Sequence, residues 1–218
     1  MYTPTHFAET DPTILRDAIR QIRAGELITY GADGLEASFV PLLISDDAAT
    51  VTGHLAKANG QWRRADLSVP ALLTWVGPDA YVSPNFYPST MEDGRVVPTW
   101  NFTAVQAKGT LVLHHEDEWK RHHVGSLTDL HERRLTSPWS VDDAPTDFID
   151  GMVKAIVGME IRLTSLVGKW KLSQNRPQAD VAGVIAGLER YGAGSHEAQV
   201  AEQMAEVAVA SVAASADD

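Results

Sequence analysis

The sequence has no cysteine among its 218 residues. This absence excludes disulfides, thiolate zinc sites and cysteine nucleophiles together. No apolar run is long enough to span a bilayer, and the first residues lack the charged-then-apolar pattern of a signal peptide. We therefore expect a protein of the reducing cytoplasm, with no membrane partner.

Positive charge is also scarce, because 18 Lys and Arg residues face 29 Asp and Glu residues, for a formal net charge of −11. This balance argues against a broad basic surface for nucleic acid, although a local basic patch would survive such an average. Basic pairs occur at 63–64, 120–121 and 133–134, but no segment is typical of a helix-turn-helix. We interpret each pair as part of a salt-bridged, solvated face.

The sequence does contain enough apolar material for a sizeable core: 44% of its residues are hydrophobic, and six are Trp. Its length suits one large domain or one domain with appendages. Asp11-Pro12 predicts the start of a helix that ends at Gly25. Further helices are expected at 118–135, 145–156 and 181–191, with a helical turn at 57–64. In the helix expected at 145–156, the spacing predicts one apolar face of Phe148, Met152, Val153 and Ile156.

Alternating patterns predict strands between these helices. The turn at 31–34 predicts a hairpin whose second strand alternates through Leu35, Ala37 and Phe39. Gly77-Pro78-Asp79 predicts a second hairpin. Strands at hairpin spacing favour an antiparallel sheet or barrel. The complete set of expected strands is 26–30, 35–44, 49–55, 71–76, 80–83, 98–115 and 158–173.

The segment after Pro177 has a different composition. It is rich in Ala and Val from 197 to 214 and ends in Asp217-Asp218. It predicts either a helix packed on a partner or a frayed tail. We expect a domain at 1–176 and a C-terminal helical segment with an acidic tail at 177–218.

Four polar and aromatic stretches combine flat side chains with cations and amides: HLAKAN (54–59), YVSPNFYP (81–88), VPTWNF (97–102) and KLSQNR (171–176). Their aromatic rings could stack on a planar heterocycle, and Lys or Arg could bind a phosphate. A Trp-Asn pair in a strand more often belongs to a core and an edge. For HLAKAN the competing interpretation is a helix cap that faces water.

The order of the motifs resembles that of the PaiB family of FMN-binding proteins, described as negative transcriptional regulators. The resemblance runs from MYTPTHF (1–7) through GHLAKAN, AYVSPNFYP, VPTWNFTAVQAKG (97–109) and LTDLHERR (127–134) to GKWKLSQNRP (168–177). Two positions depart from the pattern: Phe86 stands where Trp is expected, and Gln106 where His is expected. The segment after Gly192 matches no part of it.

The resemblance implies a mainly β fold with α-helices (α+β): an antiparallel Greek-key split β-barrel with flanking and C-terminal helices, as a homodimer. FMN would lie in a groove between the two subunits. The implied contacts fall in three groups. His54, Lys57 and Asn59 would lie near the phosphate and ribityl chain, and Ser83, Tyr87, Thr99, Trp100 and Asn101 near the flavin. Lys171, Gln174 and Arg176 would come from the last strand, from either subunit.

Three functions follow as alternatives. The first is an FMN-binding negative regulator that acts on DNA or through a protein partner. The second is a flavin-dependent oxidoreductase, since fold does not fix function. The third is a dimeric interaction protein with an empty groove. A metal site among the histidines at 114, 115, 122 and 123 is less favoured, because metal ligands usually come from distant elements. No catalytic residue is assigned.

Overall fold

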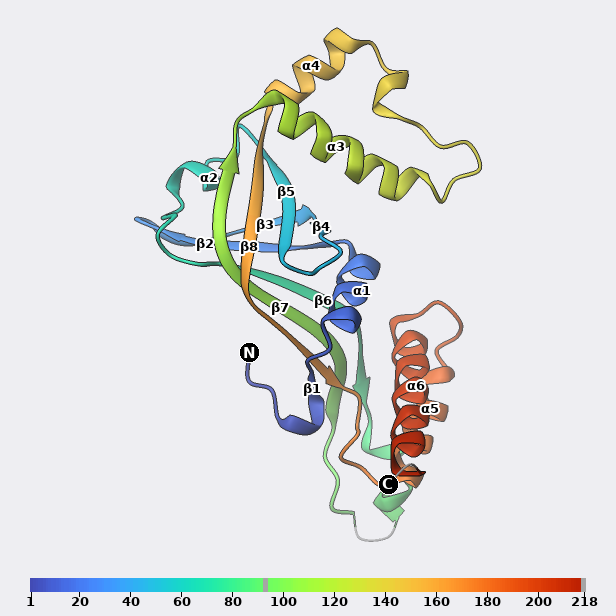
Figure 1. Cartoon of the computed structure of the whole chain (residues 1–218). Helices are drawn as coiled ribbons and strands as arrows, with labels where there is room; N and C mark the ends of the chain where they lie inside the picture. The colour runs from blue at the N-terminus through green and yellow to red at the C-terminus, as the bar shows by residue number, and fades with distance from the viewer. Residues whose placement is uncertain (92–93, 217–218) are drawn as a thin grey trace. The chain divides into compact units, whose positions relative to one another are not determined.

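The computed structural model describes residues 1–91 and 94–216, and the side chains of 1–91 and 94–209. Its strands form an eight-stranded sheet in the order β3-β2-β6-β7-β8-β5-β4, with β1 paired to β8 (Figure 1). The registers recorded for β1–β8, β2–β3, β2–β6, β4–β5 and β5–β8 are antiparallel. The strands are β1 (Ala8–Glu9), β2 (Ala24–Gly31), β3 (Gly34–Pro41), β4 (Leu43–Ile44), β5 (Thr50–Ala56), β6 (Ala71–Val82), β7 (Thr99–His114) and β8 (Ile156–Lys171). The expected antiparallel α+β class is confirmed.

The helices begin and end close to the expected positions. In α1, the Asp11 carboxylate accepts hydrogen bonds from the backbone N–H groups of Thr13 and Ile14, at 2.7 and 3.4 Å, and so caps the first turn. Leu15 and Ile19 of this helix are buried. The helices are α1 (Pro12–Ile22), α2 (Gln61–Arg64), α3 (Asp117–Glu132), α4 (Thr146–Lys154), α5 (Gln178–Glu189) and α6 (His196–Ala216). Among the described residues, no helix is long and apolar enough to cross a membrane.

The second predicted hairpin is wrong, because residues 71–82 form the single strand β6. Gly77 does not adopt a positive φ, which a tight turn would favour. A Cβ at this position would lie 2.3 Å from the Oγ1 atom of Thr103, so Gly77 permits the close approach of β7. Pro78 fits within the strand because its fixed φ is compatible with extended backbone.

The predicted apolar face of α4 is also wrong in part. Phe148 and Met152 are 59% and 51% exposed, whereas Ile149 and Val153 are buried. Ile156 lies in β8 rather than in the helix. The helix therefore packs through a face rotated by about one residue from the expected one, since positions 149 and 153 share a face at the helical period.

The chain forms two compact units. Unit 1 contains residues 1–10, 76–105 and 167–218, and unit 2 contains residues 11–75 and 106–166. In unit 1, α5 packs against α6 around a core of residues from β6, the loop after β8 and both helices. The segment left open as a helix or a frayed tail is thus a helix packed within its own unit. Its last residues, Asp217 and Asp218, lie outside the described part of the chain.

The outer side of the β2–β3 hairpin in unit 2 is apolar. Leu35, Ala37 and Phe39 alternate as expected, but Leu35 and Phe39 are both 74% exposed. Across the hairpin, Tyr30 pairs with Leu35 and is 52% exposed. The polar residue Glu36, which alternates with Leu35 and Ala37, is more covered than they are. The usual arrangement of apolar side chains inward is therefore inverted on this edge strand.

Candidate functional site

The residues predicted to contact FMN are divided between the two units. His54, Lys57 and Asn59 belong to unit 2. The remaining predicted residues belong to unit 1: Ser83, Tyr87, Thr99, Trp100, Asn101, Lys171, Gln174 and Arg176. Each unit is therefore described by itself.

Unit 1 contains a lysine–aromatic cluster, formed by Thr99, Trp100, Phe102, Lys169 and Lys171. The Lys171 ammonium donates to the hydroxyl of Thr99 at 2.7 Å and to the backbone carbonyl of Trp100. The Lys169 ammonium lies 5.4 Å from the centre of the Phe102 ring, within cation–π range. The ends of β7 and β8 thus bring together two predicted cofactor contacts, Thr99 and Trp100, with a third, Lys171.

The cluster concentrates positive charge. Burial lowers the pKa of Lys171, and the nearby charges of Lys169 and Arg176 lower it further. An ammonium in this position is held by neutral oxygens and repelled by two other cations. A bound anion would reverse that balance, because an opposite charge at short range favours the charged form of the amine.

Trp100, whose backbone carbonyl accepts from Lys171, also provides an accessible ring. Its side chain is 53% exposed, and it meets Tyr81 edge-on with the ring centres 6.1 Å apart. Tyr81 is itself 47% exposed. Rings that are partly exposed and held by an edge contact retain a free surface on which a planar heterocycle can stack.

Two predicted contacts are instead buried in the core of unit 1. Asn101 is fully buried, and its amide nitrogen donates to the hydroxyl of Ser173 at 2.9 Å. It points away from Trp100, because successive residues of a strand point to opposite sides. Tyr87 is 2% exposed, so its side chain is enclosed by the core of unit 1 rather than open to a ligand. Burial raises the pKa of Tyr87, so its phenol stays protonated at neutral pH.

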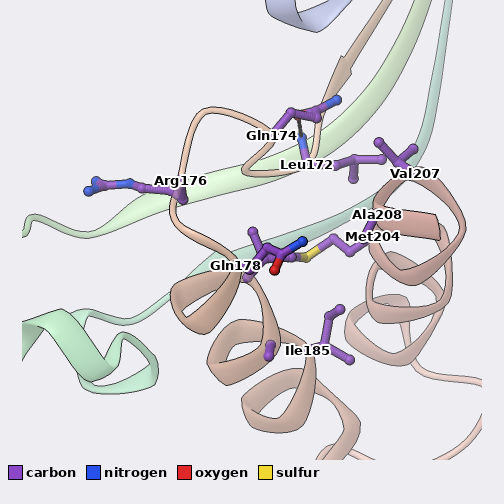
Figure 2. Close-up of a pocket in the computed structure, with 10 residues that line it drawn as sticks. Leu172, Gln174, Arg176, Gln178, Ile185, Met204, Val207 and Ala208 are labelled. Carbon is purple, nitrogen blue, oxygen red and sulfur yellow. Dashed lines mark hydrogen bonds between the residues drawn. The ribbon is translucent and has the colours of Figure 1, made fainter. Parts of the chain in front are cut away.

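Gln174 and Arg176 follow β8 and line a cleft of about 470 Å³ with α5 and α6. Figure 2 shows Arg176 directed away from the helices, while Leu172 and Met204 form the apolar wall. The Arg176 guanidinium lies 5.0 Å above the Tyr87 ring. The Gln174 amide is engaged locally: it donates to the Trp170 carbonyl at 2.6 Å and accepts from the Leu172 N–H at 2.8 Å.

Ser83 caps the short 3₁₀ helix Pro84–Phe86, because its hydroxyl accepts from the Asn85 N–H at 3.2 Å. The backbone here lies close to α5. A Cβ at Gly183 would lie 2.3 Å from the Phe86 carbonyl oxygen. Phe86, one of the two departures from the family pattern, therefore belongs to the packing of unit 1, against α5.

In unit 2, His54 contacts another histidine. Its Nδ1 atom lies 3.2 Å from Nε2 of His123, a side chain of α3 that is 3% exposed. Burial, helped by His54 and His122, lowers the pKa of His123 to about 4, and burial also lowers the pKa of His54. Both imidazoles are therefore neutral at pH 7, and one donates a hydrogen bond to the other.

Lys57 and Asn59 lie just before the start of α2. The exposed Lys57 ammonium reaches the Lys154 carbonyl at 3.4 Å. Asn59 donates to the hydroxyl of Ser38 at 2.8 Å, and its side-chain oxygen accepts from the Gln61 N–H at 3.0 Å. The helix-start interpretation of HLAKAN thus describes the hydrogen bonds of Asn59. Among the described residues, the Lys57 ammonium hydrogen-bonds only to the Lys154 carbonyl, which leaves donors for another ligand.

Two of the histidines considered for a metal, His114 and His123, are held by other contacts. His114 stacks on Trp119 with ring centres 4.0 Å apart, and its Nε2 atom lies 3.2 Å from a carboxylate oxygen of Glu160. His123 also stacks on Trp119, with ring centres 5.4 Å apart. Among the described residues, no group of three or more His, Asp or Glu side chains is placed to hold a metal ion.

Sequence reasoning missed Lys169 and His123. Lys169 lies two positions before Lys171 on one strand, so the period of two placed both cations on one side of β8. This signal was available in the sequence. The partner of His54 was not, because His54 and His123 are 69 positions apart and meet through tertiary packing.

The chemistry of the donor set in unit 1 fits FMN. Two or three cations suit a phosphate that carries about −1.5 to −2 charges near neutral pH. The exposed Trp100 ring suits a flat isoalloxazine. The cluster therefore combines, within one unit, the two kinds of contact that an FMN molecule requires.

Comparisons with known proteins agree with this fit. The model of the family described as "Putative FMN-binding domain" matches residues 1–165. The protease synthase and sporulation protein PAI 2 of Bacillus subtilis is 30% identical over 209 residues, covering 95% of this chain and 96% of that protein. The resemblance to the PaiB family is therefore confirmed.

Solved structures show the same fold at low identity. The flavocytochrome Anf3 of Azotobacter vinelandii has a TM-score of 0.55 and 13% identity, covering 81% of this chain and 75% of that chain. A conserved hypothetical protein of Mycobacterium tuberculosis has a TM-score of 0.56 and 14% identity, covering 82% and 95%. The fold is that of the split barrel. On the family match and the Bacillus relative together, the chain belongs to the family of FMN-binding domains, whose cofactor is FMN.

Proposed function

We propose that this protein is an FMN-binding negative regulator of the PaiB type, and that its flavin binds at the lysine–aromatic cluster of unit 1. The observation that supports this most is the convergence of Lys169 and Lys171 on the side chains and backbone of Thr99, Trp100 and Phe102. FMN supplies a redox-active, coloured ring system when bound. The protein side chains position it.

In this proposal, the roles follow from the chemistry of each group. Lys171 donates to the phosphate in place of, or together with, its bonds to Thr99 and the Trp100 carbonyl. Arg176 adds positive charge, and its planar guanidinium suits bidentate binding of a phosphate. Trp100 stacks on the ring. His54, Lys57 and Asn59 remain predicted contacts, supplied by the same or the partner subunit.

We also propose that the protein is a homodimer. The outer side of the β2–β3 hairpin exposes Tyr30, Leu35 and Phe39 together. A contiguous exposed apolar patch on an edge hairpin usually marks an interface. A second copy can cover it with the same surface, since two-fold interfaces are self-complementary.

The dimer is tested by light scattering of the full chain at micromolar concentration. The wild type is expected at twice the chain mass, and Phe39→Glu at the chain mass, because a buried unpaired carboxylate strongly disfavours association. Phe148→Glu is the matched control, since Phe148 is similarly exposed but lies on α4. A monomeric wild type, or equal dissociation of both variants, would contradict the proposal.

The flavin site is tested by titrating FMN into the wild type and Lys171→Ala while following absorbance and fluorescence. A colourless wild type that does not bind added FMN would contradict the proposal and favour the dimeric interaction protein with an empty groove. An unchanged affinity in Lys171→Ala would remove the cluster from the site. Circular dichroism shows whether the variant keeps its fold.

The regulator and the oxidoreductase make opposite predictions for the loaded protein. A regulator should bind a DNA or protein partner and should not catalyse sustained oxidation of NADH or NADPH. The net charge of −11 favours a protein partner over DNA. The measurements are steady-state consumption of the reduced nucleotide and salt-dependent binding to a genomic DNA library. Sustained turnover would favour the enzyme.

A further inference from the structure

Unit 2 contains an arginine cleft, and none of its lining residues is predicted to bind FMN. It has a volume of about 510 Å³ and lies among α1, β4 and α3. Arg20 and Arg23 approach it from the end of α1, and Arg133 and Arg134 from the end of α3. The Arg133-Arg134 pair, expected on a solvated, salt-bridged face, is thus brought beside two more arginines that lie more than 100 positions away.

Positive charge in this cleft exceeds negative charge. Asp46 is the one carboxylate among the described lining residues, and it pairs with Arg20 at 2.5 Å. This hydrogen bond and the charge of Arg20 lower the pKa of Asp46, which keeps it ionised. Four guanidinium groups against one carboxylate leave a local charge of about +3 in a chain whose formal charge is −11.

The other three arginines have no carboxylate partner within residues 1–91 and 94–216. Arg133 donates to a backbone carbonyl, that of Asp129, at 3.0 Å. The Nε atom of Arg23 is buried and, in the part of the chain that the structure describes, has no hydrogen-bond partner. A buried guanidinium nitrogen without an acceptor is unfavourable, because desolvation is not compensated. An oxyanion in the cleft would supply the acceptor.

The backbone at Arg23 strengthens this argument. Its φ is +69°, a conformation that glycine adopts more easily than any residue with a side chain. Its N–H donates to the Ile19 carbonyl and closes α1. A glycine would serve this role in the backbone equally well. The arginine at this position adds a cation to the cleft.

Cations near a helix C-terminus also interact favourably with the helix dipole. This effect accounts for one arginine at the end of each helix. It does not account for two arginines from each helix end that line the same cleft. The walls between them are apolar, formed by Leu42, Leu43 and Leu130. Such walls suit the organic part of a small ligand, and Ser126 adds a hydroxyl.

We infer that the arginine cleft binds a small organic ligand with adjacent phosphates, such as an organic diphosphate, independently of FMN. Guanidinium groups bind phosphate oxygens through paired N–H donors, so several arginines in one cleft match several adjacent phosphate oxygens. A small ligand fits better than nucleic acid, because the cations are confined to one cleft of an acidic protein rather than spread along a surface.

The test is calorimetric titration of the full-length, FMN-loaded protein with inorganic pyrophosphate and with inorganic phosphate. Pyrophosphate should bind about tenfold or more tightly than phosphate, and binding should weaken as salt rises. Arg134→Gln should weaken pyrophosphate binding about tenfold. Arg63→Gln is the matched control and should change it less than twofold, because Arg63 lies on Trp62, outside the cleft.

Arg134 is exposed, so its substitution is compatible with folding; Arg23→Gln is a second variant with the same expected direction. Four results would overturn the inference: no binding of pyrophosphate at millimolar concentration, equal weakening in the Arg63 control, competition between pyrophosphate and FMN, or arginine-dependent binding of duplex DNA more tightly than pyrophosphate. Competition would assign the cleft to the flavin phosphate. Preference for DNA would make it a nucleic-acid contact.

Discussion

The lysine–aromatic cluster of unit 1 and the arginine cleft of unit 2 are both cationic, yet different groups surround the cations, and we propose different ligands for the two sites. In the cluster, Lys169 lies over the ring of Phe102, and Lys171 donates to the backbone carbonyl of Trp100. In the cleft, arginines lie beside aliphatic walls. Positive charge alone therefore does not identify a ligand. The neighbouring groups do: rings select a flat heterocycle, and several guanidinium forks select a multiply charged anion.

The sharpest test of this contrast is Lys171→Ala. Removal of one charge-assisted hydrogen bond to a phosphate should cost about 1.5–3 kcal/mol, or about ten- to a hundredfold in FMN affinity. Pyrophosphate binding at the arginine cleft should not change. Lys108→Ala, an exposed lysine on β7, is the control and should leave both affinities as they are. Weaker binding of both FMN and pyrophosphate by Lys171→Ala would mean that the two ligands share one site.

Acid should destabilise unit 2, because this unit contains the pair of His54 and His123. The pKa of His123 is about 4 in the folded protein and about 6.5 when unfolded, so the unfolded chain binds more protons between these values. The free energy of unfolding is therefore highest above pH 6.5, where His123 is neutral in both states, and it decreases as the pH falls toward 4. The expected loss between pH 7 and 5 is about 2 kcal/mol.

Urea unfolding of the wild type and His123→Gln at pH 7 and pH 5 measures this effect. The variant should show a smaller difference between the two pH values, whatever its stability at pH 7. His54 titrates in the same direction and is coupled to His123, so part of the dependence should persist. Equal pH dependence in both proteins would mean that the pair does not govern acid stability.

Comparison of FMN with riboflavin tests whether the lysines or the rings dominate in unit 1. The two ligands share the ring system and differ by the phosphate. FMN should bind about tenfold or more tightly at low salt, and the gap should narrow to a few-fold at high salt, because partly exposed charges are screened. Titration of both ligands at two ionic strengths gives the result. Equal affinities at every salt concentration would leave stacking as the main contribution.

The smallest expected effect concerns Asn59. Its amide joins Ser38 to the start of α2, so Asn59→Ala should lower the free energy of unfolding by about 1 kcal/mol. If these hydrogen bonds are its role, FMN affinity should change less than twofold. A tenfold loss of FMN affinity in a stable Asn59→Ala variant would instead place HLAKAN at the phosphate.

The sequence by itself determined the antiparallel class, the position of α1 and the family. Asp11 and Pro12 determine a helix start through local hydrogen bonds and a fixed φ, which need no distant partner. The separated motifs of the PaiB pattern identify the family in the same way, by order along the chain. Lys169 was within reach of the same reasoning, since its spacing from Lys171 is a strand period.

The tertiary structure decided the rest, because side chains far apart in sequence compete for the same space. Gly77 looks like a turn residue until Thr103 occupies the place of its Cβ. Tyr87 and Asn101 look like ligand contacts until α5, α6 and Ser173 bury them. The arginine cleft exists because α1 and α3 end near each other, which no local pattern in either helix records.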